Sequence, residues 1–221
     1  MARPTVMVVA GDSILFTAVT DWIQVHVPHV RVHHVPSPRL ALAQLERQEV
    51  ATVVTALHMD ELDGFALLRG AKALRPNVPV ILCSSHVHPA LASQAVNMGA
   101  QEVLRTPINR TELLTALTLA LNTSDLAREV RIRHLMVNRL SKRREAVTQA
   151  IAARDRPTTL NLMPGRVSST RTGTSVASLN TLLDRLSHHT RLAEARLDVA
   201  EQRLIGMQHA LRHEFLKRVA C

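Results

Sequence analysis

Residues 6–12 read Val-Met-Val-Val-Ala-Gly-Asp, a short apolar run that ends in two small residues and a carboxylate. Consecutive apolar residues without polar alternation are typical of a strand buried on both faces of a parallel sheet. Asp12 and Ser13 stand where a helix is expected to begin, near Ile14, and short polar side chains cap helices well. This stretch therefore predicts the first strand and the first helix of an α/β domain.

The same alternation of strand and helix continues to residue 121. Further strands are expected at 30–35, 51–57, 78–83 and 102–104. The intervening helices are expected to stop before Pro28, to open at Ser37-Pro38, to follow Asp63-Gly64, to span 89–98, and to start at 109–111. Short connections of this kind require parallel strands joined by right-handed crossovers. The predicted fold is an α/β, five-stranded, parallel, doubly wound sheet with helices on both faces.

Several pieces of residues 1–121 resemble the receiver domains of bacterial response regulators, the CheY-like fold. The matching pieces occur in the expected order at 6–12, 57–65, 78–85, 98–100 and 104–107. In that family the working residues lie in loops at the carboxyl ends of the strands, where an aspartate accepts a phosphoryl group beside a metal-binding acidic pair. The resemblance therefore implies where a phosphorylation pocket would lie in this chain.

The residues at the implied pocket depart from the family's pattern. Alanine 56 stands at the phosphoacceptor position, and a methyl group cannot act as a nucleophile. The acidic pair is replaced by Ala10 and Gly11, with only Asp12 acidic, and the lysine by Thr106. Only the hydroxyl position survives, as Ser84, and the aromatic switch position is Val103. We therefore expect a degenerate pseudo-receiver that is not an enzyme, with no catalytic residue, metal ion or other cofactor.

Other side chains near this edge have two readings. Asp12, Asp60 and Asp63 could replace the missing carboxylate, but turn and cap roles are the favoured interpretation. The histidines of the same loops could bind a transition metal or sense pH. These are His58, His86 and His88. Twelve histidines are scattered along the chain, so three in neighbouring loops need no special cause.

The second half of the chain is helical and basic. Residues 1–121 hold nine Lys/Arg and nine Asp/Glu, so the whole net charge of +9 falls on residues 122–221. Residues 122–155 are expected to extend the fifth helix, because 111–153 contain neither proline nor glycine. Residues 156–175, with two prolines, two glycines and many Ser/Thr, predict a flexible basic linker.

Residues 176–219 predict a long amphipathic helix with apolar residues at heptad spacing. The expected seam includes Leu179, Leu183, Leu186, Leu197, Leu204 and Leu211. A seam sustained over about five heptads is typical of a coiled coil or helical bundle. The partner helix could be the preceding rod of the same chain or a second subunit. A homodimer through the C-terminal helices is the favoured interpretation.

Basic residues gather on the predicted rod. Arg139, Lys142, Arg143 and Arg144 could contact nucleic-acid phosphates, or they could form a solvated helix face. Aromatic residues make up 2 % of the chain, so base stacking on a sheet or groove is not expected. Nucleic acid is therefore kept as a second class of partner beside protein.

Two functions remain after this reading. The first is a phosphorylation-independent signalling adaptor that acts through protein contacts, with the fourth helix, fifth strand and fifth helix as the interface. Its expected contact residues are Val103, Leu104, Leu117 and Leu121. The second is a transcriptional or antitermination regulator. The two cysteines lack a metal-like or disulfide pattern, and no stretch could span a bilayer, so a cytoplasmic protein without membrane contacts is expected.

Overall fold

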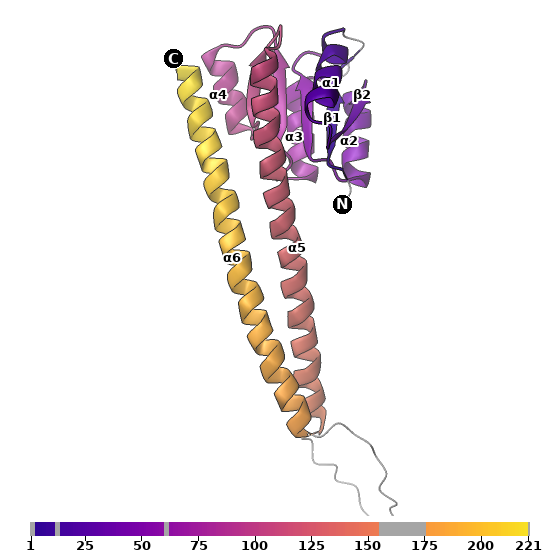
Figure 1. Ribbon diagram of the computed structural model, residues 1–221, viewed down its shortest axis with the longest axis vertical. Coiled ribbons are helices and arrows are strands. Elements are labelled where there is room, and N and C mark those ends of the chain that lie inside the picture. Colours follow the sequence, from indigo (N-terminus) through magenta and orange to yellow (C-terminus); the bar gives the residue numbers. More distant parts are fainter. Residues whose placement is uncertain (1–2, 12–13, 60–61, 155–175, 221) are drawn as a thin grey trace, which may run out of the picture. The chain divides into compact units, whose positions relative to one another are not determined.

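The computed structural model describes residues 3–11, 14–59, 62–154 and 176–220 (Figure 1). The elements follow one another as β1 (Thr5–Val9), α1 (Ile14–His26), β2 (Arg31–Val35), α2 (Pro38–Arg47), β3 (Thr52–Ala56), α3 (Gly64–Leu74), β4 (Val80–Ser84), α4 (Pro89–Asn97), β5 (Glu102–Arg105), α5 (Arg110–Arg154) and α6 (Val176–Ala220). Every predicted strand and helix of the first half is present, and the boundaries differ from the predicted ones by at most two residues.

The five strands form one parallel sheet in the order β2-β1-β3-β4-β5. Its two faces are covered by different helices. One apolar cluster joins the sheet to α2, α3 and α4, and the other joins it to α1 and α5. Both clusters are mainly aliphatic, with the strand residues Val6 to Val9 completely buried. The predicted doubly wound α/β architecture is confirmed.

Polar side chains cap the first turns of α3 and α5. The Asp63 carboxylate accepts a hydrogen bond from the backbone N–H of Ala66 at 2.6 Å, which makes Asp63 the N-cap of α3. Asn109 accepts hydrogen bonds from the N–H groups of Thr111 and Glu112 at the start of α5. Each cap satisfies donors that the first helical turn leaves without a partner.

The chain divides into two compact units, and each is described here by itself. The first comprises residues 1–128 together with 203–221, and the second comprises 129–202. The first unit thus extends beyond the predicted boundary at residue 121 and includes the last part of α6. The predicted linker, residues 156–175, lies outside the described residues. Among the described helices, none combines the length and the apolar character needed to cross a bilayer.

The second unit consists of parts of α5 and α6 that lie side by side (Figure 1). Among its described residues, Val130 of α5 and Thr190, Leu197 and Ala200 of α6 are buried. The Thr190 hydroxyl donates to the backbone carbonyl of Leu186, so its burial leaves no unsatisfied donor. Within this unit the two helical segments of one chain therefore pack against each other.

Candidate functional site

The carboxyl edge of the sheet brings the residues of the predicted pocket together. Ala56 is the last residue of β3 and Ser84 the last residue of β4, while Ala10 and Thr106 directly follow β1 and β5. The strands lie side by side in the order β1-β3-β4-β5, so these four positions share one edge. Gly11 is exposed beside them. Asp12, the remaining predicted member, lies outside the described residues.

The described side chains at this edge are small and uncharged. Ala10 and Ala56 carry methyl groups at the ends of the neighbouring strands β1 and β3. The Ser84 hydroxyl is buried, donates to the backbone carbonyl of His86 at 3.3 Å, and accepts from the His86 N–H at 3.2 Å. It therefore stabilises the turn after β4. The Thr106 N–H donates to the carbonyl of Ser84, which ties the ends of β4 and β5 together.

Two further side chains near the edge are Cys83, which is buried, and Arg105, which is exposed. Cys83 pairs in register with Ala56, and burial raises the pKa of its thiol to about 12. Since the thiolate is the nucleophilic form, this cysteine is an inert core residue at neutral pH. Arg105 is exposed at the end of β5, one residue before the position that the family's lysine occupies.

Two of the loop carboxylates and histidines, Asp63 and His88, cap helices. Asp63 caps α3, as its favoured interpretation predicted, and Asp60 lies outside the described residues. His88 is the N-cap of α4, because its Nδ1 accepts from the Leu91 N–H at 3.2 Å. His58 and His86 are exposed. Within the described part of the chain, no group of three or more His, Cys, Asp or Glu side chains could hold a metal ion.

The predicted interaction residues need a correction. Val103, Leu104, Leu117 and Leu121 are all buried in the two apolar clusters of the receiver-like unit. Leu117 is completely buried. Their apolar character reflects the packing of β5 and α5 onto the sheet, so they are unavailable to a partner protein. A contact surface at this place would have to use exposed residues of the same elements.

The end of α6 packs against this same region of the first unit. Phe215 is 2 % exposed and belongs to the cluster that contains Val103 and the α4 residue Val96. Arg212 donates from Nη2 to Oδ1 of Asn97, the last residue of α4, at 3.1 Å. The sequence reading did not identify these contacts. Phe215 carries a signal for them, because it is the single aromatic residue in residues 122–221.

A second contact joins the last part of α6 to Thr123 of α5. The buried Thr123 hydroxyl lies 3.3 Å from the Met207 sulfur and also donates to the carbonyl of Leu119. Leu204, three residues before Met207, is also buried, with 7 % of its surface exposed. Together with Phe215, these residues show that the last turns of α6 form part of the receiver-like unit.

The predicted α6 seam corresponds to the least exposed face of the helix. Leu197 and Leu204 are buried, and the remaining predicted seam residues are half-buried: Leu179, Leu183, Leu186 and Leu211. In the second unit, His134 Nε2 of α5 lies 3.5 Å from a carboxylate oxygen of Glu201 of α6. Within the single chain, the seam thus faces α5 in that unit.

The basic cluster of α5 is open to solvent. Arg139, Lys142 and Arg143 are exposed, whereas Arg144 is half-buried. Three large apolar side chains precede them on the same helix, and sequence reasoning did not single these out. Ile132, Leu135 and Met136 are 46 %, 64 % and 59 % exposed. The three exposed apolar side chains lie within five consecutive residues of α5.

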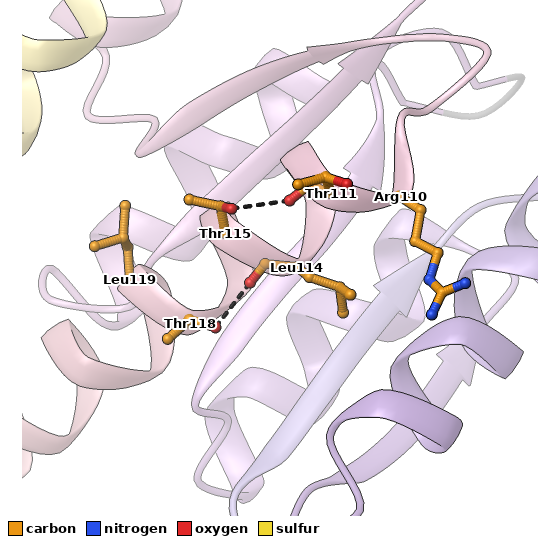
Figure 2. Close-up of a pocket in the computed structure, with 6 residues that line it drawn as sticks. All are labelled: Arg110, Thr111, Leu114, Thr115, Thr118 and Leu119. Carbon is orange, nitrogen blue, oxygen red and sulfur yellow. Dashed lines mark hydrogen bonds between the residues drawn. The ribbon is translucent and has the colours of Figure 1, made fainter.

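A shallow depression on the outer side of α5 is shown in Figure 2. It is lined by Arg110, Thr111, Leu114, Thr115, Thr118 and Leu119. The hydroxyls of Thr115 and Thr118 donate to backbone carbonyls one turn earlier in the helix. Arg110 is hydrogen-bonded to His26 at the end of α1. Because the polar groups already have partners in the protein, the depression lacks the convergent polar groups of a ligand site.

Residues 6–118 match the family described as the response regulator receiver domain. This chain belongs to that family, as the order of its strands and the matching pieces of its sequence indicated. Its curated relatives include transcriptional regulatory proteins and response regulators. The transcriptional regulatory protein GlrR of Escherichia coli K12 is 33 % identical over 98 residues, which are 44 % of this chain and 22 % of that protein. The putative response regulator NtrX-like of Rickettsia conorii is 34 % identical over 91 residues, or 40 % and 19 % of the two chains.

Solved receiver domains share the fold. The signal receiver domain of an HD-domain-containing protein from Pseudomonas fluorescens Pf-5 has a TM-score of 0.52 and 27 % identity, and the match covers 58 % of this chain and 94 % of that one. A receiver domain of a LuxO repressor-like protein from Vibrio parahaemolyticus has a TM-score of 0.54 at 24 % identity, covering 58 % and 97 %. The chain thus spans about a fifth of the length of its curated relatives and nearly all of these isolated domains.

Proposed function

We propose that this chain is a phosphorylation-independent signalling adaptor, a pseudo-receiver that communicates through protein contacts. The observation that carries the proposal is Ala56 at the end of β3, the position from which the family's aspartate attacks phosphorus. An alanine methyl has no lone pair with which to form an acyl phosphate. Ala10 at the end of β1 supports the same conclusion, because it offers no oxygen to a metal ion.

The test is phosphoryl transfer to the full-length chain. We expect no phosphoryl group on the intact protein after incubation with acetyl phosphate and Mg²⁺, measured by mass spectrometry under conditions that preserve acyl phosphates. A known phosphorylatable receiver domain treated in parallel controls for the donor. Incorporation into the wild-type chain would refute the proposal. Its loss in Asp12→Asn or Asp63→Asn would then identify the substitute nucleophile.

The adaptor proposal includes a homodimer formed through the C-terminal helices. Leu192 and Val199 support it, because they are seven residues apart on α6 and are 45 % and 56 % exposed. Seven residues are two helical turns, so the two side chains lie on one face. Light scattering should give about twice the 24.4 kDa chain mass. The double substitution L192Q/V199Q should return the mass to that of one chain, and a wild-type monomer would contradict this part.

A transcriptional or antitermination regulator is the second candidate function. It is supported by curated relatives that are transcriptional regulatory proteins and by the exposed Arg139, Lys142 and Arg143. Binding to a nucleic-acid duplex would weaken as salt rises, with a slope that reports the number of phosphates contacted. Replacement of Arg139 and Arg143 should make the affinity depend less steeply on salt. Duplex binding that these substitutions leave unchanged would argue against this role for the basic cluster.

A further inference from the structure

One face of α5 combines apolar and basic side chains that the second unit leaves open. It consists of Ile132, Leu135, Met136, Arg139, Lys142 and Arg143, which we call the α5 stripe. Their spacing from the first member is three, four, seven, ten and eleven residues, which places them on one side of a helix. All six are exposed. The stripe extends about 16 Å along the helix axis.

The stripe faces away from the packed side of α5. Val130 is buried, and Arg133, Val137 and Leu140 are half-buried, which marks the side that is covered. The stripe residues occupy the other side of the helix, at about half a turn from Val130. Packing within the unit therefore does not account for three large apolar side chains at 46 to 64 % exposure.

The charge of this stretch is one-sided. Residues 131–144 contain six Lys/Arg and no Asp/Glu. Among the described residues, Arg139, Lys142 and Arg143 form no ion pair. Arg139 and Arg143 are four residues apart, a spacing at which like charges destabilise a helix. The arrangement costs the isolated protein stability, and an anionic partner would remove that cost.

We propose that the α5 stripe is a docking surface for an acidic amphipathic helix of another protein. The apolar ridge of Ile132, Leu135 and Met136 would receive the partner's apolar side chains, and the cations one turn further would face its carboxylates. Recognition of a helix through anchors spaced by three and four residues is a common mode of binding. The stripe combines apolar and basic side chains. The phosphates of a nucleic acid would pair with the cations but would leave the apolar ridge uncovered, whereas an acidic amphipathic helix would cover both. This inference rests on the proposed adaptor function and names the chemistry of its partner.

The experiment uses the full-length chain and a fluorescein-labelled helical peptide of Leu, Ala and Glu, with leucines at three- and four-residue spacing and glutamates beside them. Fluorescence anisotropy should show saturable binding that weakens as salt rises. The substitutions L135Q/M136Q and R139E/R143E should each weaken binding at least tenfold. A version of the peptide with lysine in place of glutamate should bind wild type poorly and R139E/R143E better.

Matched controls separate the stripe from general surface properties. R39E/R69E changes the net charge as much as R139E/R143E, and V25Q/L40Q removes two other exposed apolar side chains. Both should alter the affinity less than twofold. Equal losses in the control and stripe variants would overturn the proposal, as would tighter binding of a nucleic-acid duplex or of phosphatidylserine vesicles than of the acidic peptide. Phosphoryl incorporation is measured separately, so failure of the adaptor function and failure of this surface are distinguishable.

Discussion

Arg212 of α6 donates a hydrogen bond to Asn97 of α4 across 115 residues of sequence, at an Nη2–Oδ1 distance of 3.1 Å. The contact lies within the first unit, and Phe215 lies one turn further along α6 in its buried core. A segment that sequence patterning places in a separate helical tail thus contributes to the receiver-like domain.

Replacing Phe215 should therefore destabilise the receiver-like unit. We expect F215A to lower its free energy of unfolding by about 3 kcal/mol, because a buried aromatic side chain leaves a cavity when it is removed. Urea denaturation followed by circular dichroism measures the change. L216A is the matched control, since its side chain is 40 % exposed, and it should cost less than about 1 kcal/mol. Equal effects would place Phe215 outside the core.

Two glycines should respond in opposite directions to alanine. A Cβ on Gly64 would lie 2.6 Å from the backbone oxygen of Ala56 and 2.9 Å from the Leu57 Cα, so G64A should force the backbone to shift and lower stability by about 1–3 kcal/mol. A Cβ on Gly206 meets nothing within 4 Å, and this helical position should gain about 0.5–1 kcal/mol. Thermal melts of both variants check the contrast. A G64A protein as stable as wild type would show that the close approach is absent.

Lys72 should make stability depend on pH. Burial lowers the pKa of its ammonium from 10.5 to about 8, while its Nζ donates to the backbone carbonyl of Val78 at 2.6 Å. Between pH 8 and 10.5 the unfolded chain holds the proton more tightly than the folded protein, so this group makes the unfolding free energy rise with pH over that range. Below pH 8 its contribution is constant.

The measurement compares wild type with K72M, because both share Cys83. That thiol has its pKa raised to about 12 in the folded protein and acts in the opposite direction above pH 9. The difference in unfolding free energy between the two proteins should therefore change with pH from 8 to 10.5. A pH-independent difference for K72M would refute the lowered pKa.

Cys83 should be protected from thiol reagents while the protein is folded. It is 3 % exposed and its thiol stays protonated at neutral pH. In a C221S variant, which leaves it as the only cysteine, labelling by Ellman's reagent should be slow and should accelerate with urea as the domain unfolds. Rapid labelling in the absence of denaturant would show that the end of β4 opens readily.

The receiver-like fold was predictable because each strand is an uninterrupted apolar run, as at 6–9 and 78–83, bounded by turn and cap residues. A single hydrogen bond was predictable too, because the short polar side chain of Asp63 before a helix indicated the N-cap that the structure shows. The contact face was not predictable, because hydrophobicity alone does not separate core from interface, and Leu117 proved to be core.

The division of α6 between two units also gave no signal. Leu197 and Leu204 continue one heptad row across the boundary near residue 203, so the pattern does not change where the packing partner does. The α5 stripe was overlooked for a related reason. Ile132 and Met136 look like core residues in the sequence, and only their exposure in the structure distinguishes them.

The burial of Phe215 has a consequence for synthesis. All five strands leave the ribosome before residue 110, yet the aromatic ring that completes one side of their core is made about a hundred residues later. During translation the nascent domain carries an unfilled apolar site at α4 and β5, which chaperones or a neighbouring nascent chain can reach until the final helix arrives.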